Sequence, residues 1–212
     1  MIIGFTGYQR AGKDTAADYF VKNFKFEKVG FADKFKEAFC VLTGLDRTEL
    51  EILKNDRTAY LAIGYINNPS ESPTDEDVSF AEESDGSVRM WSPVVDPITV
   101  RHALQRLGTE VGRQLFADNF WVTMLDEHIA TMGFQNVVIP DVRFVNEVDY
   151  IHSVGGKIIL VERDSATAQE THRSEIRLPN ELIDYIINNS GSMRALEAQL
   201  EHLARKFKER IK

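Results

Sequence analysis

The stretch GYQRAGK, residues 7–13, has the spacing Gly-x-x-x-x-Gly-Lys and decides the predicted fold. It follows a short apolar run at residues 1–6, which is typical of a buried parallel strand. After it, apolar residues recur at three- and four-residue spacing up to Phe24, as in a helix with one buried face. The glycines of such a loop let backbone N–H groups turn inward around phosphate oxygens, and Lys13 adds a full positive charge. The sequence therefore predicts a phosphate-binding loop between a strand and a helix.

The residues that follow Lys13 depart from the common form of this loop. Asp14 stands where a Ser or Thr hydroxyl usually binds Mg²⁺, and Thr15 comes next. Because a carboxylate is a hard oxygen ligand, we expect Asp14 to hold Mg²⁺ directly or through a water molecule. Thr15 is then expected to contact an α-phosphate oxygen.

Length, charge and cysteine content limit the classes of function. The 212 residues, of which 43% are hydrophobic, suit one large domain or a core with small insertions. A formal net charge of -8 argues against a protein that holds nucleic acid by neutralising its phosphates. Cys40 is the single cysteine, which excludes an intrachain disulfide and favours a reducing compartment. The N-terminus lacks the pattern of a secretion signal, and no run of about 18 apolar residues occurs. We therefore expect a cytoplasmic protein that binds neither nucleic acid nor a membrane.

Strand patterns and helix patterns alternate along the chain. Apolar and β-branched runs predict strands at residues 1–6, 25–31, 136–140, 157–162 and 185–187. Amphipathic patterns predict helices from residue 13, from 33, at 47–56, from 99, at 120–132, at 145–154 and from 192. Such alternation is typical of a three-layer α/β/α fold, in which helices cover both faces of a central parallel sheet.

The periodicity fades between residues 64 and 97. Residues 71–85 combine acidic side chains with Ser, Pro and Gly, which is typical of a solvated hairpin or mobile loop inserted into a domain. A functional acidic motif is the alternative interpretation.

A second group of charged residues follows the predicted strand at residues 136–140. Asp141 and Arg143 emerge at the carboxyl end of this strand, where open α/β sheets bind ligands. We expect Asp141 to order Mg²⁺ and Arg143 to bind a phosphate with its planar guanidinium. Glu147 lies four residues after Arg143, where it can hold Arg143 in place or accept a substrate hydroxyl, although an ordinary surface ion pair has the same spacing.

Arginines also gather after the predicted strand at residues 157–162. Arg163 follows that strand directly, and residues 171–177 contain two more arginines. This pattern suits a lid that closes over transferring phosphates and adds positive charge, and a plain solvated loop is the alternative.

Six segments in the same order resemble the bacteriophage deoxynucleoside monophosphate kinases. They are residues 12–15, 31–33 with Lys36, 104–110, 120–122, 141–143 with 146–147, and 172–175. The resemblance implies a P-loop NTPase fold of the nucleoside monophosphate kinase type, formed by residues 1–212 as a single kinase domain. It further implies an acceptor-binding segment at 33–98, which contains the acidic insertion at 64–97, and a lid segment at 163–180.

The resemblance also implies a reaction and its residues. The ATP γ-phosphoryl group would move to a deoxynucleoside 5′-monophosphate (dNMP), with Mg²⁺ between the two nucleotides, giving ADP and the diphosphate. Together with the charge pattern, we expect Lys13, Asp141, Arg143 and Arg163 to be the catalytic residues, and Asp14 and Asp141 to be the metal ligands. Residues implied to bind ATP are Arg10, Ala11, Gly12, Lys13, Asp14, Thr15 and Asn188. Residues implied to bind the dNMP are Gln9, Lys36, Arg57, Arg101, Gln105, Gly108, Thr109, Trp121, Asp141, Arg143 and Glu147.

Two other functions stay open at the level of sequence. One is a P-loop kinase that acts on a non-nucleotide metabolite such as dephospho-coenzyme A, and the other is a nucleotide-binding regulator without an acceptor. The sequence also leaves open the preferred base and the formation of a homodimer. If a phage encodes the chain, the host cytoplasm is the expected location.

Overall fold

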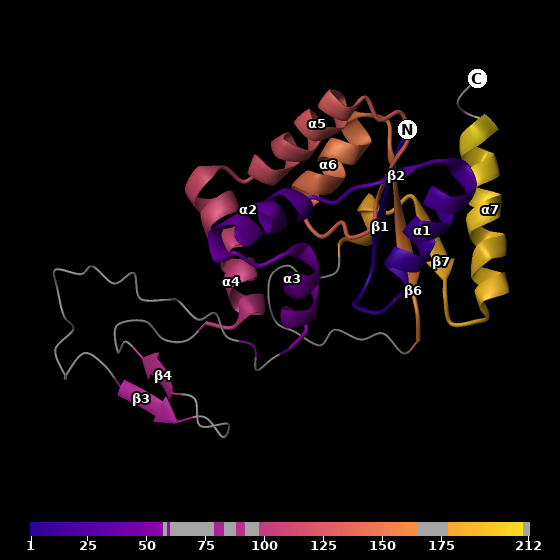
Figure 1. Cartoon of the computed structure of the whole chain (residues 1–212). Coiled ribbons are helices and arrows are strands. Elements are labelled where there is room, and N and C mark those ends of the chain that lie inside the picture. The colour runs from indigo at the N-terminus through magenta and orange to yellow at the C-terminus, as the bar shows by residue number, and fades with distance from the viewer. Residues whose placement is uncertain (57–58, 60–78, 83–87, 92–97, 165–177, 210–212) are drawn as a thin grey trace. The chain divides into compact units, whose positions relative to one another are not determined.

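The computed structural model describes residues 1–56, 59, 79–82, 88–91, 98–164 and 178–209 (Figure 1). The chain divides into two compact units, Met1–Ala38 with Gly108–Lys212 and Phe39–Leu107. Arg57, most of the acidic insertion and residues 165–177 of the lid segment lie outside the described residues. The predicted domain and segment boundaries therefore stay predictions.

The first unit is built around a parallel sheet. Its described residues form five strands in the order β2-β5-β1-β6-β7, and all four pairings are parallel. The strands are β1 (Ile2–Thr6), β2 (Glu27–Lys28), β5 (Val137–Ile139), β6 (Lys157–Glu162) and β7 (Tyr185–Asn188). Register is set by pairs such as Ile3 with Val138 and Gly4 with Ile158. The predicted central parallel sheet is confirmed.

Helices cover both faces of this sheet, which confirms the three-layer prediction (Figure 1). On one face, Ile3 and Phe5 of β1 pack in a core with α1 (Lys13–Phe24) and α7 (Met193–Glu209). On the other face, Ile2 packs in a core with α5 (Phe120–Met132) and α6 (Val145–Ser153). Successive strand residues face opposite sides of a sheet, so one apolar strand supplies both cores.

Two further helices lie near the points where the chain passes between the units. Helix α2 spans Asp33–Thr43, and the π-helix η1 spans Leu107–Phe116. The sequence predicted one amphipathic helix from residue 99, but the structure divides it into an α-helix, α4 (Val100–Arg106), and η1. A short 3₁₀ turn, η3 (Asn180–Leu182), precedes β7.

The second unit contains helices and a strand pair. Helix α3 (Arg47–Leu53) begins with a capping box, in which the Asp46 carboxylate accepts from the Glu49 amide and Glu49 accepts from the Asp46 amide. Strands β3 (Ser79–Glu82) and β4 (Val88–Trp91) are antiparallel, as in the hairpin predicted for the insertion. Among the described residues, no helix has the length and apolar character needed to cross a membrane.

Candidate active site

The loop between β1 and α1 has the backbone of a phosphate-binding loop. Gly7 has a φ of 141°, and a Cβ at this position would lie 2.3 Å from the carbonyl oxygen of Val161 in β6. Gly12 has a φ of 102° and directly precedes Lys13, the first residue of α1. Both glycines are therefore needed, since an L side chain rarely adopts these angles and the space beside Gly7 is closed.

Asn189, which follows β7, binds the backbone of this loop. Its side-chain amide donates a hydrogen bond to the carbonyl of Ala11 at 2.8 Å, and its backbone N–H donates to the backbone carbonyl of Glu162 at 2.7 Å. A Cβ at Gly12 would lie 2.2 Å from the Asn189 amide nitrogen. The neighbouring Asn188, which the sequence predicted to bind ATP, is exposed, and its side-chain oxygen accepts from the Ser190 amide.

Lys13 is buried at the start of α1 with its ammonium group turned back to the loop. Its Nζ donates to the carbonyls of Gly7 at 2.8 Å and Tyr8 at 3.0 Å. The same Nζ lies 3.3 Å from a carboxylate oxygen of Asp141. The lysine of the loop is thus paired with an acidic residue that follows another strand.

Asp141 also binds Arg143, so its carboxylate joins two cations. The Nε of Arg143 donates to the second oxygen of Asp141 at 2.7 Å. Partial desolvation tends to raise the pKa of Asp141, but Arg143 and Lys13 outweigh it and hold the pKa below its ordinary value. The carboxylate is therefore ionised at neutral pH, and its side chain is still 42% exposed.

The sheet topology explains why these residues meet. Strand β1 ends at Thr6 and the adjacent strand β5 ends at Ile139, and the two strands run parallel. The segments after both strands therefore leave the same edge of the sheet. The amide of Val142 donates to the carbonyl of Phe5 at 2.9 Å and so continues the pairing past the end of β5.

Glu147 is buried behind Arg143 and does not face solvent. One of its oxygens accepts from the backbone amides of Arg143 at 2.8 Å and Phe144 at 3.1 Å. The other accepts from the guanidinium of Arg113 at 2.5 Å. Glu147 thus contacts the backbone of Arg143 and holds it in place, which is one of the two roles that the spacing suggested.

The sequence model of the deoxynucleotide monophosphate kinase family matches residues 43–200. The chain belongs to this family. The deoxynucleotide monophosphate kinase of Enterobacteria phage T4 is 27% identical over 95% of this chain and 97% of its own length. That of Escherichia phage RB69 is 26% identical over 96% of this chain and 99% of its own length. The shikimate kinase from Bacteroides thetaiotaomicron, a solved structure, covers 98% of both chains with 14% identity and a TM-score of 0.42. The predicted resemblance to phage kinases is confirmed.

In this family member, Trp121 is packed inside the first unit. Its side chain is 7% exposed, its indole N–H donates to the carbonyl of Gly108 at 2.7 Å, and its ring centroid lies 5.3 Å from that of Phe35. Thr109 beside it is partly exposed. The contact between Trp121 and Gly108 is therefore a packing contact, and a role of these residues in binding a base stays a prediction.

The remaining predicted site residues of this family member lie in several places. Asp14 is 77% exposed and forms an ion pair with Lys28 at 2.9 Å. Arg10 and Arg163 are exposed, whereas Gln9 and Lys36 are half-buried. Arg101 and Gln105 belong to α4 in the second unit.

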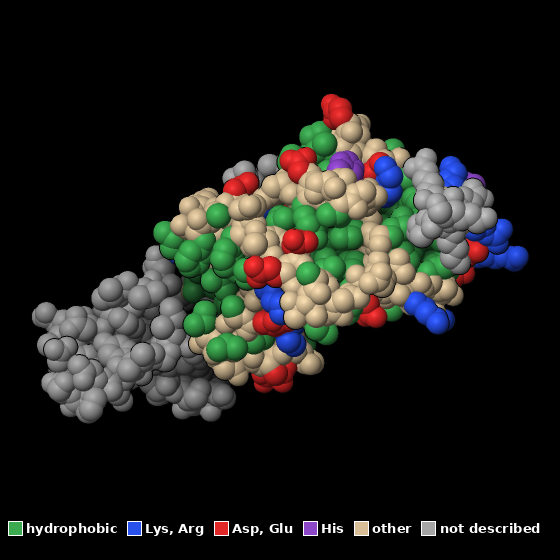
Figure 2. Space-filling view, turned by 90° about the horizontal axis from the view of Figure 1, so that it is seen from above, with side chains coloured by type: hydrophobic (Ala, Val, Ile, Leu, Met, Phe, Trp, Pro, Cys, Tyr) green, Lys and Arg blue, Asp and Glu red, His purple; other side chains and the backbone are tan. Residues whose placement is uncertain are grey.

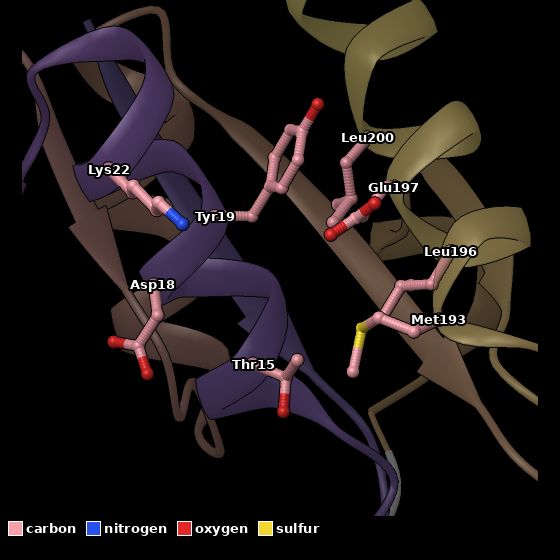
Figure 3. Close-up of a pocket in the computed structure, with 8 residues that line it drawn as sticks. All are labelled: Thr15, Asp18, Tyr19, Lys22, Met193, Leu196, Glu197 and Leu200. Carbon is pink, nitrogen blue, oxygen red and sulfur yellow. The ribbon is translucent and has the colours of Figure 1, made fainter.

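A groove of about 160 Å³ runs between α1 and α7 beside the phosphate loop. Thr15, two residues after Lys13, lines it from α1, and Met193 lines it from α7 (Figure 3). Tyr19 also lines it, and its hydroxyl donates to Glu201 at 3.2 Å. The groove has mixed apolar and charged walls and opens next to the residue predicted to contact an α-phosphate.

Two residues that hold the site together are absent from the sequence-based predictions. They are Arg113, which binds Glu147, and Asn189, which binds Ala11 and directly follows the predicted ATP residue Asn188. No local signal marks Arg113, because it is one of 25 lysines and arginines, most of which are expected at the surface.

Proposed function

We propose that this chain transfers the γ-phosphoryl group of ATP to a deoxynucleoside 5′-monophosphate, giving ADP and the diphosphate. The observation that supports this most directly is the position of Asp141, whose carboxylate contacts both Lys13 and Arg143. A lysine of a phosphate loop and an arginine of a second strand end thereby share one centre, as a reaction between two polyanions requires. Relatives that are named deoxynucleotide monophosphate kinases support the choice of acceptor.

The reaction needs positioning and positive charge more than covalent chemistry. Phosphoryl transfer passes through a loose transition state whose charge is spread over the equatorial oxygens. We assign Lys13 to the β- and γ-phosphates, and Arg143 to the phosphate of the acceptor and the transferring group. The exposed side chains of Arg10 and Arg163 add positive charge around the donor.

The residues present fit a magnesium ion held mainly by the substrates. Among the described residues, no group of three or more His, Cys, Asp or Glu is placed to hold a metal ion. Mg²⁺ bound to nucleotides keeps several waters and uses only one or two protein carboxylates, so a larger group is not required. Asp141 is ionised and partly exposed, and Asp14 is exposed at the start of α1. We assign both as Mg²⁺ ligands, directly or through water, and the ion would neutralise phosphate charge.

The binding of the two bases is assigned more coarsely. We assign the adenine of ATP to the mouth of the groove between α1 and α7, which Thr15 lines just after the phosphate loop. Asn188 stays a predicted ATP-binding residue. The dNMP is assigned to the predicted residues Gln9, Lys36, Arg57, Arg101, Gln105, Gly108, Thr109, Trp121 and Glu147. Glu147 would act on the acceptor through the backbone of Arg143.

The proposed partners are small nucleotides and neither nucleic acid nor a membrane, and the formation of a homodimer stays open. On the face shown in Figure 2, acidic and basic side chains are interspersed, and the coloured residues form no continuous basic stripe. We place the enzyme in the cytoplasm, that of the host if a phage encodes it, because the single Cys40 suits a reducing compartment and the relatives come from phages.

A coupled assay of ADP formation tests the proposal. Purified protein receives ATP, Mg²⁺ and each of the four common dNMPs or a modified dNMP, and we expect ADP and the matching diphosphate with at least one of them. Lys13→Met should abolish turnover, while Lys34→Met, at a partly exposed lysine paired with Glu37, should leave it unchanged. Absence of ADP formation with every dNMP would reject the proposed function.

A further inference from the structure

A buried ion pair lies behind the proposed phosphate site. Arg113 of η1 and Glu147 of α6 are 7% and 3% exposed, and their side chains meet at 2.5 Å. Both belong to the first unit of the chain. Burial of two charges costs several kcal/mol per ion unless their geometry and further hydrogen bonds compensate, so a pair of this kind is weak evidence for stability alone.

The guanidinium of Arg113 is held by several groups at once. Besides Glu147, it donates to the carbonyl of Asp118 at 3.0 Å and to the side-chain oxygen of Asn146 at 3.1 Å. Its central carbon lies 3.9 Å from the centroid of the Phe144 ring. These contacts fix both the position and the plane of the guanidinium, which a lysine at the same place could not reproduce.

Glu147 connects the fixed guanidinium of Arg113 to the backbone of Arg143. The oxygen that does not meet Arg113 accepts from the backbone amides of Arg143 and Phe144. The side chain of the same Arg143 binds Asp141 at 2.7 Å, and Asp141 contacts Lys13. An unbroken series of contacts therefore runs from Arg113 to the phosphate loop.

The charge of Arg113 keeps Glu147 able to accept these hydrogen bonds. Burial raises the pKa of Glu147 to about 7, although the Arg143 amide and the Arg113 guanidinium oppose the rise. Without Arg113, the carboxylate would lose its counter-charge and bind a proton more readily. A neutral carboxyl group accepts weaker hydrogen bonds than a carboxylate, so the turn at Arg143 would loosen.

We propose that Arg113 is a positioning residue for phosphoryl transfer, which acts through Glu147 to fix the backbone and hence the side-chain direction of Arg143. This inference rests on the proposed function, in which Arg143 contacts the acceptor phosphate and the transferring group. The π-helical form of η1 agrees with it, since π-helical turns occur frequently at functional sites.

A double-mutant cycle separates positioning from mere stabilisation. We expect Arg113→Lys to lower kcat by about tenfold or more, because it displaces a charge contact of the transition state, with the KM for ATP changed by less than about twofold. In an Arg143→Ala background, Arg113→Lys should have less than about a twofold further effect, because the side chain it directs is absent. If the loss of kcat in the double variant equals the product of the losses in the two single variants, the two residues act independently and the inference is overturned.

A matched control uses another charged group at the sheet. Asp184 contacts Lys157 and His152 but no residue of the Arg113 series. Asp184→Asn should lower the midpoint of unfolding while leaving kcat per folded molecule unchanged. A kcat loss as large as that of Arg113→Lys would show that any weakened charge pair slows the reaction, against a specific role of Arg113.

Hydrogen exchange tests the same inference without enzyme activity. We expect the backbone amides of Arg143 and Phe144 to exchange about tenfold faster in Arg113→Lys and Arg113→Met, while the amide of Ile159 in the central sheet stays unchanged. If Arg113→Met fails to fold, the exchange rates of Arg113→Lys alone decide the outcome.

The exchange experiment is independent of the proposed function. If the wild-type protein transfers phosphate to no dNMP, the proposed function is wrong, and the exchange rates still show whether Arg113 fixes the backbone of Arg143. Unchanged exchange at Arg143 in the folded variants would overturn the inference.

Discussion

The ammonium group of Lys13 lies 3.3 Å from the carboxylate of Asp141, although the two residues follow different strands of the sheet. The contact exists because β1 and β5 are parallel neighbours whose carboxyl ends share one edge. In this arrangement, Lys13 is already desolvated and held by two carbonyls of its own loop. A nucleotide phosphate would therefore replace existing partners of Lys13, with little further loss of hydration.

Loss of either cation at this centre should slow the reaction strongly. We expect Lys13→Ala and Arg143→Ala each to cut kcat/KM by on the order of a hundredfold or more, as removal of a transition-state charge contact usually does. Arg205→Ala on the exposed face of α7 is the matched control, because Arg205 is 73% exposed and bound only to a neighbour on its own helix, Glu201, among the contacts described. Steady-state rates with ATP and the best dNMP measure the effect. Near-normal activity in either variant would remove that residue from the proposed mechanism.

Substitution of the two assigned metal ligands should change the magnesium requirement. Asp141→Asn and Asp14→Ala should each raise the Mg²⁺ concentration for half-maximal rate, by about tenfold, because each removes an anionic oxygen ligand. Titration of turnover with Mg²⁺ at saturating ATP gives the measurement. If Asp14→Ala leaves this dependence unchanged, Asp14 serves only its ion pair with Lys28.

Asn189 should matter for ATP binding through its bond to Ala11. Asn189→Ala removes the side-chain amide that donates to Ala11. We therefore expect the KM for ATP to rise about fivefold to tenfold, which corresponds to one lost hydrogen bond. Asn189→Asp keeps the shape but places a carboxylate against the Ala11 carbonyl and beside the phosphates, and its KM should rise further. Equal effects of the two substitutions would show that the charge near the loop is unimportant.

Much of the fold could be predicted from the sequence because it depends on local patterns. The structure has α5 at Phe120–Met132 and β6 at Lys157–Glu162, the ranges that the apolar periodicity indicated. The phosphate loop is likewise a local feature, since its glycines and its lysine determine the turn together. The position of Asp141 at a ligand-binding strand end was predicted from the rule that ligands bind at the carboxyl ends of parallel strands, whereas its contact with Lys13 is known from the structure.

The rest depended on contacts between distant segments. At 3.6 residues per turn, Arg113 lies roughly 180° around a helix from Leu104 and would face solvent. The switch to a π-helix after Arg106 changes that angle. Arg113 is buried as a result, and the buried Glu147 is its ion-pair partner. Trp121 was likewise predicted to bind the dNMP, and its hydrogen bond to the carbonyl of Gly108 is a contact that the sequence does not show. Neither partner could be known before the segments were brought together.

The close contact between Gly112 and Trp121 predicts a loss of stability on substitution. A Cβ at Gly112 would lie 2.2 Å from the indole nitrogen of Trp121. Gly112→Ala should therefore force the ring or η1 to move and lower the free energy of unfolding by about 1–3 kcal/mol. Gly191→Ala is the control, because its Cβ would lie at an ordinary 3.6 Å from Ala195. Urea unfolding of both variants measures the difference, and equal stability would show that the ring adapts freely.

The carboxylate of Asp184 should make stability depend on pH at the acid end. One oxygen binds Lys157 at 2.6 Å, and the other binds His152 at 2.8 Å and the amide of Ile158 at 2.9 Å. Burial opposes ionisation, but these partners outweigh it and hold the pKa of Asp184 below its ordinary value of 3.8. A carboxyl group with a lowered pKa in the folded state stabilises that state above its unfolded pKa, and the contribution is lost as the pH falls through the folded pKa.

Asp184→Asn should therefore cost about 1–3 kcal/mol of unfolding free energy at neutral pH, because three donors lose an ionised acceptor. The gap between wild type and variant should narrow as the pH falls below the ordinary value of 3.8. Urea unfolding of both proteins across this range gives the gap directly, and the titrating groups that do not contact Asp184 cancel in the difference. A gap that stays the same at the lowest pH would mean that shape and not charge carries the contribution of Asp184.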